Sequence, residues 1–186
     1  MFENTDIRIT DVKVTSNAPF FSNRSVSGRY QKRFTGIQFY ELEFTAQYMS
    51  QDTRKIQNFI ATHQQAVPFD FELSYLTSYS GAAQGMITAI AAAQQGSRQV
   101  KLGTFNGVLE AGTIIQFQNH SKLYTVTQDA RANDELKLFP NLRNQVQADE
   151  QINYVNPKGK FILTNEKYSM DLRSLSKFKF TATEAL

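Results

Sequence analysis

A two-residue alternation of apolar and polar side chains recurs along most of the chain and constrains the fold more than any other feature. Residues 36–49 read GIQFYELEFTAQYM and alternate in this way, with one change of phase near Tyr40. A strand places successive side chains on opposite faces of a sheet, so the alternation predicts a half-buried strand. The phase change predicts a long strand that curves or is shared between two sheets. The alternating apolar residues are Ile37, Phe39, Leu42, Phe44, Ala46 and Tyr48.

Further runs of the same kind lie on both sides of this segment. Residues 7–14 alternate with a change of phase that predicts a β-bulge near Asp11, and residues 69–75 alternate without one. Two more runs lie near the C-terminus, the first through Tyr168, Met170 and Leu172 and the second through Phe178 and Phe180. The chain has 15 Phe and 8 Tyr but no Trp, a composition that favours sheet. We therefore expect a mainly β protein.

One segment has a helical period instead. In residues 50–65, Ile56, Phe59, Ile60 and His63 are spaced as one face of an α-helix, and Ser50 or Asp52 is available as the N-cap. Pro68 follows and stops the helix. The sequence therefore predicts one α-helix, with His63 as a partly buried structural residue.

The middle of the chain predicts a second domain. Residues 77–97 are rich in Ala, Gly, Gln and Ser and are compatible with either a short strand near residues 86–90 or a weak helix. Short strands separated by turns follow, as in a small barrel. The two C-terminal runs are too short to fold alone and need a sheet to join. We therefore expect a β-sandwich-like domain with one helix, from residues 1–95 and 164–186, and an inserted barrel from residues 96–163.

This central region resembles the barrel of distal tail proteins of long-tailed bacteriophages. The resemblance is carried by four short motifs in a fixed order: a Leu and an Ala-Gly turn, a Tyr-x-Val-Thr strand, an aromatic-Pro-x-Leu-Arg segment, and an Asn-Pro-x-Gly loop before a Phe-x-Leu strand. Thr113 departs from the pattern, because the family commonly has Asp there. The matching residues are Leu109, Ala111, Gly112, Tyr124, Val126, Thr127, Phe139, Pro140, Leu142, Arg143, Asn156, Pro157, Gly159, Phe161 and Leu163.

The resemblance implies a structural virion protein. In that family the outer domain forms a hexameric ring that continues the tail tube and docks the hub of the tip or baseplate below it. The barrel resembles an oligonucleotide- and oligosaccharide-binding fold on the outside of the ring. The implied partners are further copies of the chain, the tail tube protein and the hub protein, with DNA passing through the lumen as non-specific cargo. The implied location is the phage tail tip, after assembly in the host cytoplasm.

A closed ring requires contacts between identical subunits, and unpaired sheet edges are natural places for them. We expect such edges on the strand 36–49 and on the terminal strands 168–181, although these strands are also able to pair with each other inside one subunit. The candidate interface residues are Ile37, Phe39, Leu42, Phe44, Tyr48, Met170, Leu172, Phe178 and Phe180.

Several other classes of function are disfavoured. The chain has no cysteine, which removes disulfides and thiolate chemistry, and its net charge of +3 is spread without runs of like charge, unlike a nucleic-acid-binding arm. Only His63 and His120 are potential neutral-pH bases, and His120 falls in a predicted loop. No catalytic, metal-ligand or cofactor motif is present. We expect no enzyme activity, cofactor or metal, and neither a standard export signal nor a membrane span.

Two alternatives stay open at this stage. The barrel itself is a candidate binding module for glycans or single-stranded nucleic acid, and Phe117, Tyr124 and Phe139 would then form an exposed stacking platform. We expect these three rings to pack in the core instead, and the basic turn 157–160 to be a solvated hairpin tip. The other alternative is a different tail ring protein, such as a tube or terminator subunit.

Overall fold

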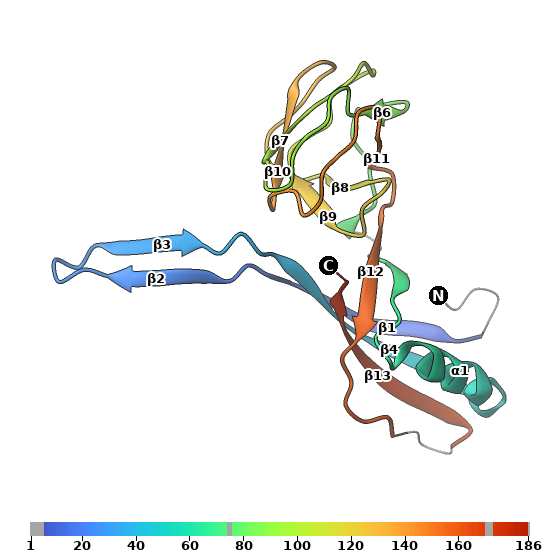
Figure 1. Cartoon of the computed structure of the whole chain (residues 1–186). Coiled ribbons are helices and arrows are strands. Elements are labelled where there is room, and N and C mark those ends of the chain that lie inside the picture. The colour runs from blue at the N-terminus through green and yellow to red at the C-terminus, as the bar shows by residue number, and fades with distance from the viewer. Residues whose placement is uncertain (1–5, 74–75, 170–172, 186) are drawn as a thin grey trace. The chain divides into compact units, whose positions relative to one another are not determined.

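The computed structural model describes residues 6–73, 76–169 and 173–185, which form a mainly β protein with one α-helix (Figure 1). The chain divides into two compact units. The sheet unit comprises Met1–Asn17, Phe39–Phe71 and Lys160–Ala185, and the barrel unit comprises Ala18–Gln38 and Glu72–Gly159. The sheet unit is therefore discontinuous in sequence.

A five-stranded sheet forms the sheet unit, with the strand order β1-β4-β13-β12-β5. Its edge strand β1 contains the bulge expected from the sequence, since Asp11 has a φ of 52° and the register with β4 shifts between Thr10 and Lys13. The strands are β1 Arg8–Asn17, β4 Phe39–Met49, β5 Phe69–Glu72, β12 Lys158–Leu163 and β13 Leu175–Glu184.

The predicted change of phase in the second long strand is wrong. β4 begins at Phe39 and alternates regularly to its end, with its even-numbered residues buried. Ile37 precedes the strand and is exposed, and the polar Gln38 takes the buried position beside it. The apparent phase change therefore marks the start of the strand rather than a bend within it.

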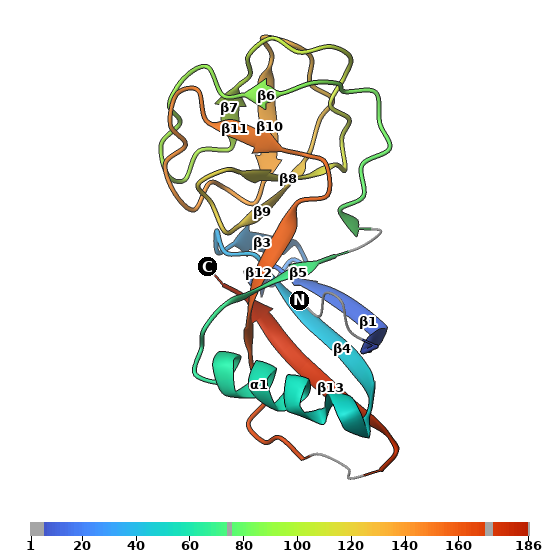
Figure 2. The ribbon, with the colours of Figure 1, turned by 90° about the vertical axis from the view of Figure 1, so that its right-hand side faces the viewer.

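The helix lies on one face of the sheet (Figure 2). A short 3-10 turn, η1 (Ser50–Asp52), leads into α1 (Thr53–His63), whose buried residues Ile56, Phe59 and Ile60 are those of the predicted apolar face. Asp52 is the N-cap by position, but its side chain forms no capping hydrogen bond. It forms an ion pair with Lys55 at 2.7 Å instead.

Phenylalanine rings fill the space between the helix and the sheet. Phe180 of β13 stacks on Phe44 of β4 at 5.0 Å between ring centroids, and Phe59 of α1 meets Phe180 edge-on at 5.4 Å. Such aromatic contacts add to the stability gained from burying the rings. We call the connected set the phenylalanine cluster; it consists of Phe44, Phe59, Phe69, Phe71, Phe161, Phe178 and Phe180.

Six short strands of the barrel unit form a sheet in the order β6-β11-β8-β9-β10-β7. Its two edge strands also meet: Ile90 N–H donates to the Lys101 carbonyl at 3.0 Å, and Gly103 N–H donates to the Thr88 carbonyl at 2.8 Å. The sheet thus closes on itself around a buried apolar core. The strands are β6 Ile87–Thr88, β7 Gln99–Lys101, β8 Ile114–Phe117, β9 Leu123–Val126, β10 Glu135–Phe139 and β11 Gln151–Asn153.

The unit boundaries in the structure differ from those expected at residues 95/96 and 163/164. They lie at 71/72 and 159/160. Ile87 and Ala89 are fully buried in the barrel core, so the Ala- and Gly-rich segment belongs to the barrel. β12 pairs with β13 in the sheet unit, so the C-terminal boundary lies near the start of β12.

A two-stranded hairpin, which the sequence did not predict, also clusters with the barrel unit. It consists of β2 (Phe20–Arg24) and β3 (Tyr30–Phe34), the blue ribbon of Figure 1. Nine of its ten strand residues are exposed, and only Phe34 is half-buried. The hairpin therefore contributes almost no buried surface to the fold.

Replacing Phe180 with Ala tests the phenylalanine cluster. Phe180 is fully buried, so F180A should lower the free energy of unfolding by about 3–5 kcal/mol through lost burial and the cavity left behind. Urea unfolding followed by circular dichroism measures this. The matched control is F21A, because Phe21 is 71% exposed, and this change should cost less than about 0.5 kcal/mol. Equal effects of the two substitutions would contradict the assignment.

Candidate assembly interface

The strands expected to form subunit edges lie in the interior of the sheet. β4 pairs with β1 and β13, and β13 pairs with β4 and β12. The structure therefore corrects the assignment of edges, because within the described residues the edge strands are β1 and β5. Of the candidate interface residues, Ile37 is exposed, Phe39 is half-buried, and Met170 and Leu172 lie outside the described residues. The others are buried within the sheet unit; they are Leu42, Phe44, Tyr48, Phe178 and Phe180.

β1 is one real edge of the sheet. Among the described residues it pairs with β4 alone, so the hydrogen-bonding groups along its other side have no neighbouring strand. Ile9 and Val12 are large apolar residues of this strand and are exposed. Exposed edges of this kind are places where another chain is able to pair, although the bulge at Asp11 limits the regular length available.

The hairpin of β2 and β3 is the most exposed apolar and basic feature of the described chain. Phe20, Phe21 and Tyr30 are exposed on its strands, and Val26 is exposed in its turn. Four basic residues lie among them without any acidic residue between positions 18 and 38; they are Arg24, Arg29, Lys32 and Arg33. Lys32 Nζ lies 3.5 Å above the centre of the Phe20 ring, a cation–π contact within the hairpin.

The turn of the hairpin is well defined. Ser25 N–H donates to the Arg29 carbonyl at 2.9 Å, and Gly28 N–H donates to the Ser25 carbonyl at 2.8 Å. Gly28 has a φ of 82°, a conformation that favours glycine. An isolated two-stranded hairpin is only marginally stable in water and needs a surface to pack on. An ordered turn on a ribbon with exposed aromatic rings is therefore suited to contact a partner.

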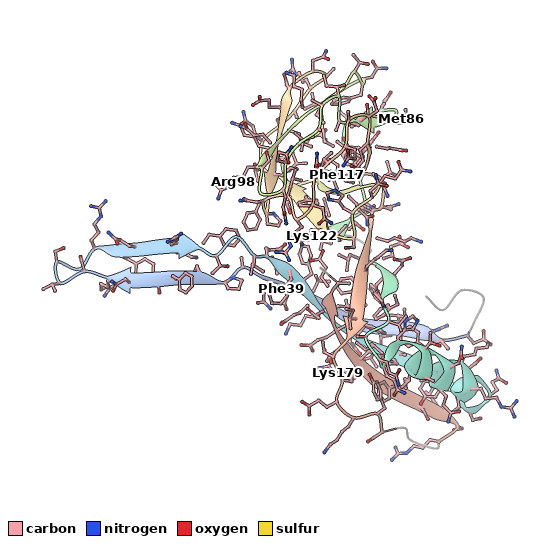
Figure 3. All side chains as sticks on the ribbon, in the orientation of Figure 1. Phe39, Met86, Arg98, Phe117, Lys122 and Lys179 are labelled. Atoms are coloured by element: carbon pink, nitrogen blue, oxygen red, sulfur yellow. The ribbon has the colours of Figure 1, made fainter. Side chains whose placement is uncertain are left out.

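The face of the sheet opposite α1, which we call the open face, carries equal numbers of acidic and basic residues on β4 and β13. Glu43 on β4 lies 2.7 Å from Lys179 on β13 and 3.8 Å from Lys13 on β1, and Lys179 is labelled in Figure 3. The hydrogen bond and charge of Lys179, and then the charge of Lys13, lower the pKa of Glu43. On β4 and β13 the open face carries two acidic and two basic residues among Thr and Gln; these are Glu41, Glu43, Thr45, Gln47, Lys177, Lys179, Thr181 and Thr183.

Several residues of the barrel motif stabilise the barrel. Leu109, Tyr124 and Val126 are buried in its core. Gly112 has a φ of 90° and donates its N–H to the Val126 carbonyl at 2.7 Å. Asn156 also has a positive φ, and the Phe139–Pro140 peptide bond is cis. The expectation of a solvated hairpin tip at 157–160 is wrong, because Pro157 and Gly159 are buried and β12 begins at Lys158.

A carboxylate fixes the turn that begins at Ala111, although Thr113 replaces the Asp expected there. Asp129 Oδ1 accepts a hydrogen bond from Ala111 N–H at 2.8 Å. The backbone of Thr113 takes part in the same turn, since its N–H donates to the Glu110 carbonyl at 3.2 Å and its carbonyl accepts from Val126 N–H. A carboxylate from another part of the barrel therefore bonds the turn.

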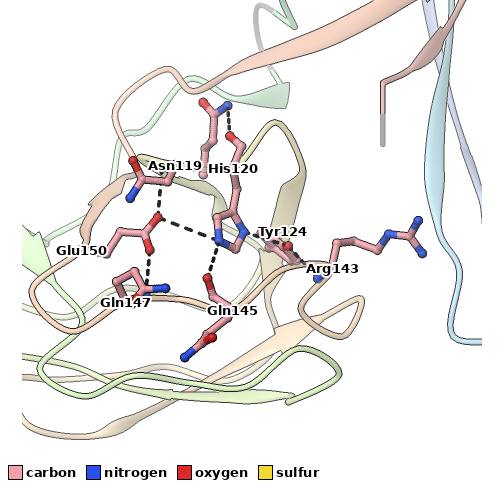
Figure 4. A network of polar contacts seen from close by, with 8 residues as sticks. Asn119, His120, Tyr124, Arg143, Gln145, Gln147 and Glu150 are labelled. Carbon is pink, nitrogen blue, oxygen red and sulfur yellow. Dashed lines mark hydrogen bonds and ion pairs between the residues drawn. The ribbon is translucent and has the colours of Figure 1, made fainter.

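His120 lies in a loop, as expected, but its side chain is buried in a polar network (Figure 4). Its Nδ1 lies 3.2 Å from the Tyr124 hydroxyl, and its Nε2 lies 3.9 Å from Glu150 Oε1. Glu150 also accepts hydrogen bonds from the backbone N–H groups of Asn119 and Gln147, at 2.9 Å each. The network ties two loops of the barrel together.

His63 has a structural role in the sheet unit. It is half-buried, its Nδ1 lies 2.9 Å from the Val67 carbonyl oxygen, and its ring contacts Phe59 and Phe69. This placement agrees with the predicted partly buried histidine. The two histidines belong to different units.

Two of the three barrel aromatics behave as expected, and the third does not. Phe117 and Tyr124 are fully buried. Phe139 is 37% exposed, so the prediction of core packing is wrong for this residue. Leu136 and Leu138 occupy the inward positions of β10, and Phe139 therefore points outward from the strand. The alternation within ELKLF already indicates that Phe139 lies on the outward face.

A clamp between Tyr79 and Glu110 fastens the segment that enters the barrel. The Tyr79 hydroxyl donates to Glu110 Oε2 at 2.7 Å, and Ala82 N–H donates to Glu110 Oε1 at 2.6 Å. Ala83 N–H in turn donates to the Tyr79 hydroxyl at 2.7 Å. These hydrogen bonds lower the pKa of Glu110, whereas burial and the bond to Glu110 raise the pKa of Tyr79 to about 12.

The described residues contain no group of three or more His, Cys, Asp or Glu side chains that could hold a metal ion. No helix in this part of the chain is long and apolar enough to cross a membrane.

Comparison with protein-family models finds none that matches the chain, and comparison with curated proteins finds no similar protein. The resemblance to distal tail proteins therefore stays a prediction that rests on the motifs themselves.

Replacing Glu110 with Gln tests the clamp through its pH dependence. The lowered pKa of Glu110 means that its ionised form stabilises the fold above the ordinary value of 4.5, and that this contribution is lost as the pH falls through the lower folded-state pKa. At neutral pH, E110Q should lower the free energy of unfolding by about 1 kcal/mol, the size of one hydrogen bond. The difference between the two proteins in urea should shrink as the pH falls below 4.5. A difference that stays constant with pH would contradict the clamp.

Proposed function

We propose that this chain is a structural virion protein, the distal tail protein of a long-tailed bacteriophage, and that it forms a ring joining the tail tube to the hub of the tip or baseplate. The hairpin of β2 and β3 carries the proposal. Its aromatic residues are exposed in the isolated chain, and contact with a neighbouring subunit would bury them. The resemblance supplies the number of six subunits, the tube and hub partners, and the location in the phage tail tip.

The hairpin is suited to a repeated head-to-tail contact. A ring of identical subunits needs two different surfaces on each chain, one of which meets the other surface on the next copy. The hairpin supplies one such surface, and the exposed edge of β1 supplies a second candidate. Arg24, Lys32 and the rings beside them favour a partner surface that combines apolar and acidic groups.

The open face of the sheet suits a passage for DNA. A wall rich in unpaired Lys and Arg would bind phosphates and retard the cargo, because each contact releases counterions and adds affinity. On β4 and β13 this face carries Glu41 and Glu43 against Lys177 and Lys179, with Thr and Gln between them, and Lys179 is paired with Glu43. We propose that the part of the open face formed by β4 and β13, which has no net charge, lines the lumen of the ring.

Another tail ring protein, such as a tube or terminator subunit, is the nearest alternative. It would share a sheet with exposed edges but would need no inserted barrel. The closed six-stranded barrel favours the distal tail protein over that alternative.

Assembly of the purified chain tests the proposal directly. Negative-stain electron microscopy and light scattering after size exclusion should show a closed ring with a central bore, alone or with tail tube and hub proteins. A compact monomer at high concentration that never assembles with tail components would reject it.

The double substitution of Phe21 and Tyr30 by Ser tests the role of the hairpin. Both side chains are exposed, so F21S/Y30S should leave the circular dichroism and unfolding midpoint nearly unchanged, while ring formation weakens by about tenfold or more. The matched control is M86S/V155S, which removes two exposed apolar residues of the barrel and should leave the ring intact. If the control disrupts the ring and the hairpin variant does not, the assignment of the hairpin is wrong.

A further inference from the structure

The outer surface of the barrel unit has a cavity of about 510 Å³ beside Phe139. We call it the Phe139 cavity. Its volume lies within the range of pockets that bind small molecules. The lining residues are Phe34, Arg98, Gln99, Thr127, Lys137, Leu138 and Phe139, all of them in the barrel unit.

Two aromatic rings form the apolar wall of the cavity. Phe139 on β10 and Phe34 at the end of β3 lie 5.4 Å apart between ring centroids, tilted by 40°. At this separation the rings contact each other, so a ligand would lie against the pair rather than between them. An outward-facing Phe on a barrel strand loses the stability that burial would supply, and the other two strand aromatics of the barrel are fully buried.

Arg98 and Lys137 add positive charge to the cavity, and both residues are exposed. Arg98 Nε donates to Asn141 Oδ1 at 2.8 Å, which orients the guanidinium and leaves its remaining donors available for a ligand. Among the described residues neither cation forms an ion pair, and no acidic residue lines the cavity. The cavity therefore combines a flat apolar wall with unneutralised positive charge.

The backbone holds this arrangement in place. Leu138 N–H donates to the Arg98 carbonyl, and Thr127 N–H donates to the Lys137 carbonyl, both at 2.9 Å. These bonds join the segments that carry the aromatic, cationic and polar lining residues. The site is thus formed before a ligand arrives, which reduces the cost of binding.

We propose that the Phe139 cavity binds a sugar that carries a phosphate or carboxylate group. The apolar face of the sugar ring lies against Phe139, and Arg98 and Lys137 neutralise the anionic group by charge-assisted hydrogen bonds. Gln99 and Thr127 supply polar groups for the hydroxyls. This site does not depend on ring assembly, because every lining residue comes from one chain.

The size of the site favours a single sugar unit over single-stranded nucleic acid. Proteins that bind single strands stack successive bases on several aromatic side chains along a basic groove. Here the aromatic wall is one touching pair, and the barrel rings Phe117 and Tyr124 are buried. The six described barrel strands offer no further exposed aromatic for a second base, and the aromatics of the hairpin other than Phe34 do not line the cavity.

Titrations of the full chain followed by amide chemical shifts in NMR spectra test the proposal. The probes are glucose-6-phosphate, N-acetylglucosamine-1-phosphate and glucuronic acid, with neutral glucose, inorganic phosphate and an oligothymidine as separate arms. At least one acidic sugar should shift the amides of residues 98, 99 and 137, with an affinity about tenfold or more above that of glucose or phosphate alone.

Two variants connect binding to the cavity. F139A should weaken binding of the acidic sugar by about tenfold, through loss of the stacking wall. R98Q alters only an exposed side chain, so it should preserve the fold, and it should remove the preference for the acidic sugar over glucose. The matched control is R131Q, because Arg131 is exposed on the barrel and outside the cavity; its binding should equal that of the unaltered chain.

Several results would overturn the assignment. They are the absence of binding by all three acidic sugars, equal binding by R98Q and the unaltered chain, or shifts that map elsewhere on the barrel. Tight binding of oligothymidine without binding of acidic sugars would replace the proposal with a nucleic-acid site. None of these results bears on whether the chain forms a ring, so the two proposals fail separately.

Discussion

The phenylalanine cluster is the constraint on which the sheet unit depends. Rings from β4, α1, β5, β12 and β13 contact one another in a connected network, so these elements have to approach from two separate stretches of the chain. The face of β4 and β13 that carries the cluster is buried along both strands. The edge at β1, the open face and the exposed residues of the hairpin take no part in this cluster.

Much of the fold was predictable because burial inside one subunit leaves a period in the sequence. The bulge at Asp11, the apolar face of α1 and the alternation of β13 all follow from that period. The hairpin was missed because Phe20, Phe21 and Tyr30 are mixed with basic and polar residues, and a ribbon that buries nothing has no alternation to detect. The segment of β6 stayed ambiguous between a short strand and a weak helix, because small residues surround it.

The error about the interface has a different cause. Alternation shows that Phe44 and Phe180 are buried, but it does not show whether the covering surface belongs to the same chain or to a neighbour. The helix turned out to be the cover, through Phe59. The alternation of β10 indicates that Phe139 lies on the outward face of the strand, and the expectation of core packing did not take this into account. An outward aromatic beside unpaired cations is the signal that identifies the cavity, and only the structure brings Phe34 and Arg98 to it.

β5 and β12, the strands through which the chain leaves and re-enters the sheet unit, are neighbours in the same sheet. The segment between β5 and β12 leaves the sheet and returns to it at adjacent strands. A change in the length or sequence of this segment therefore does not require the sheet to rearrange. The barrel is therefore an insertion that the sheet does not need for its own packing. Another module could take its place while the sheet and its phenylalanine packing stay intact.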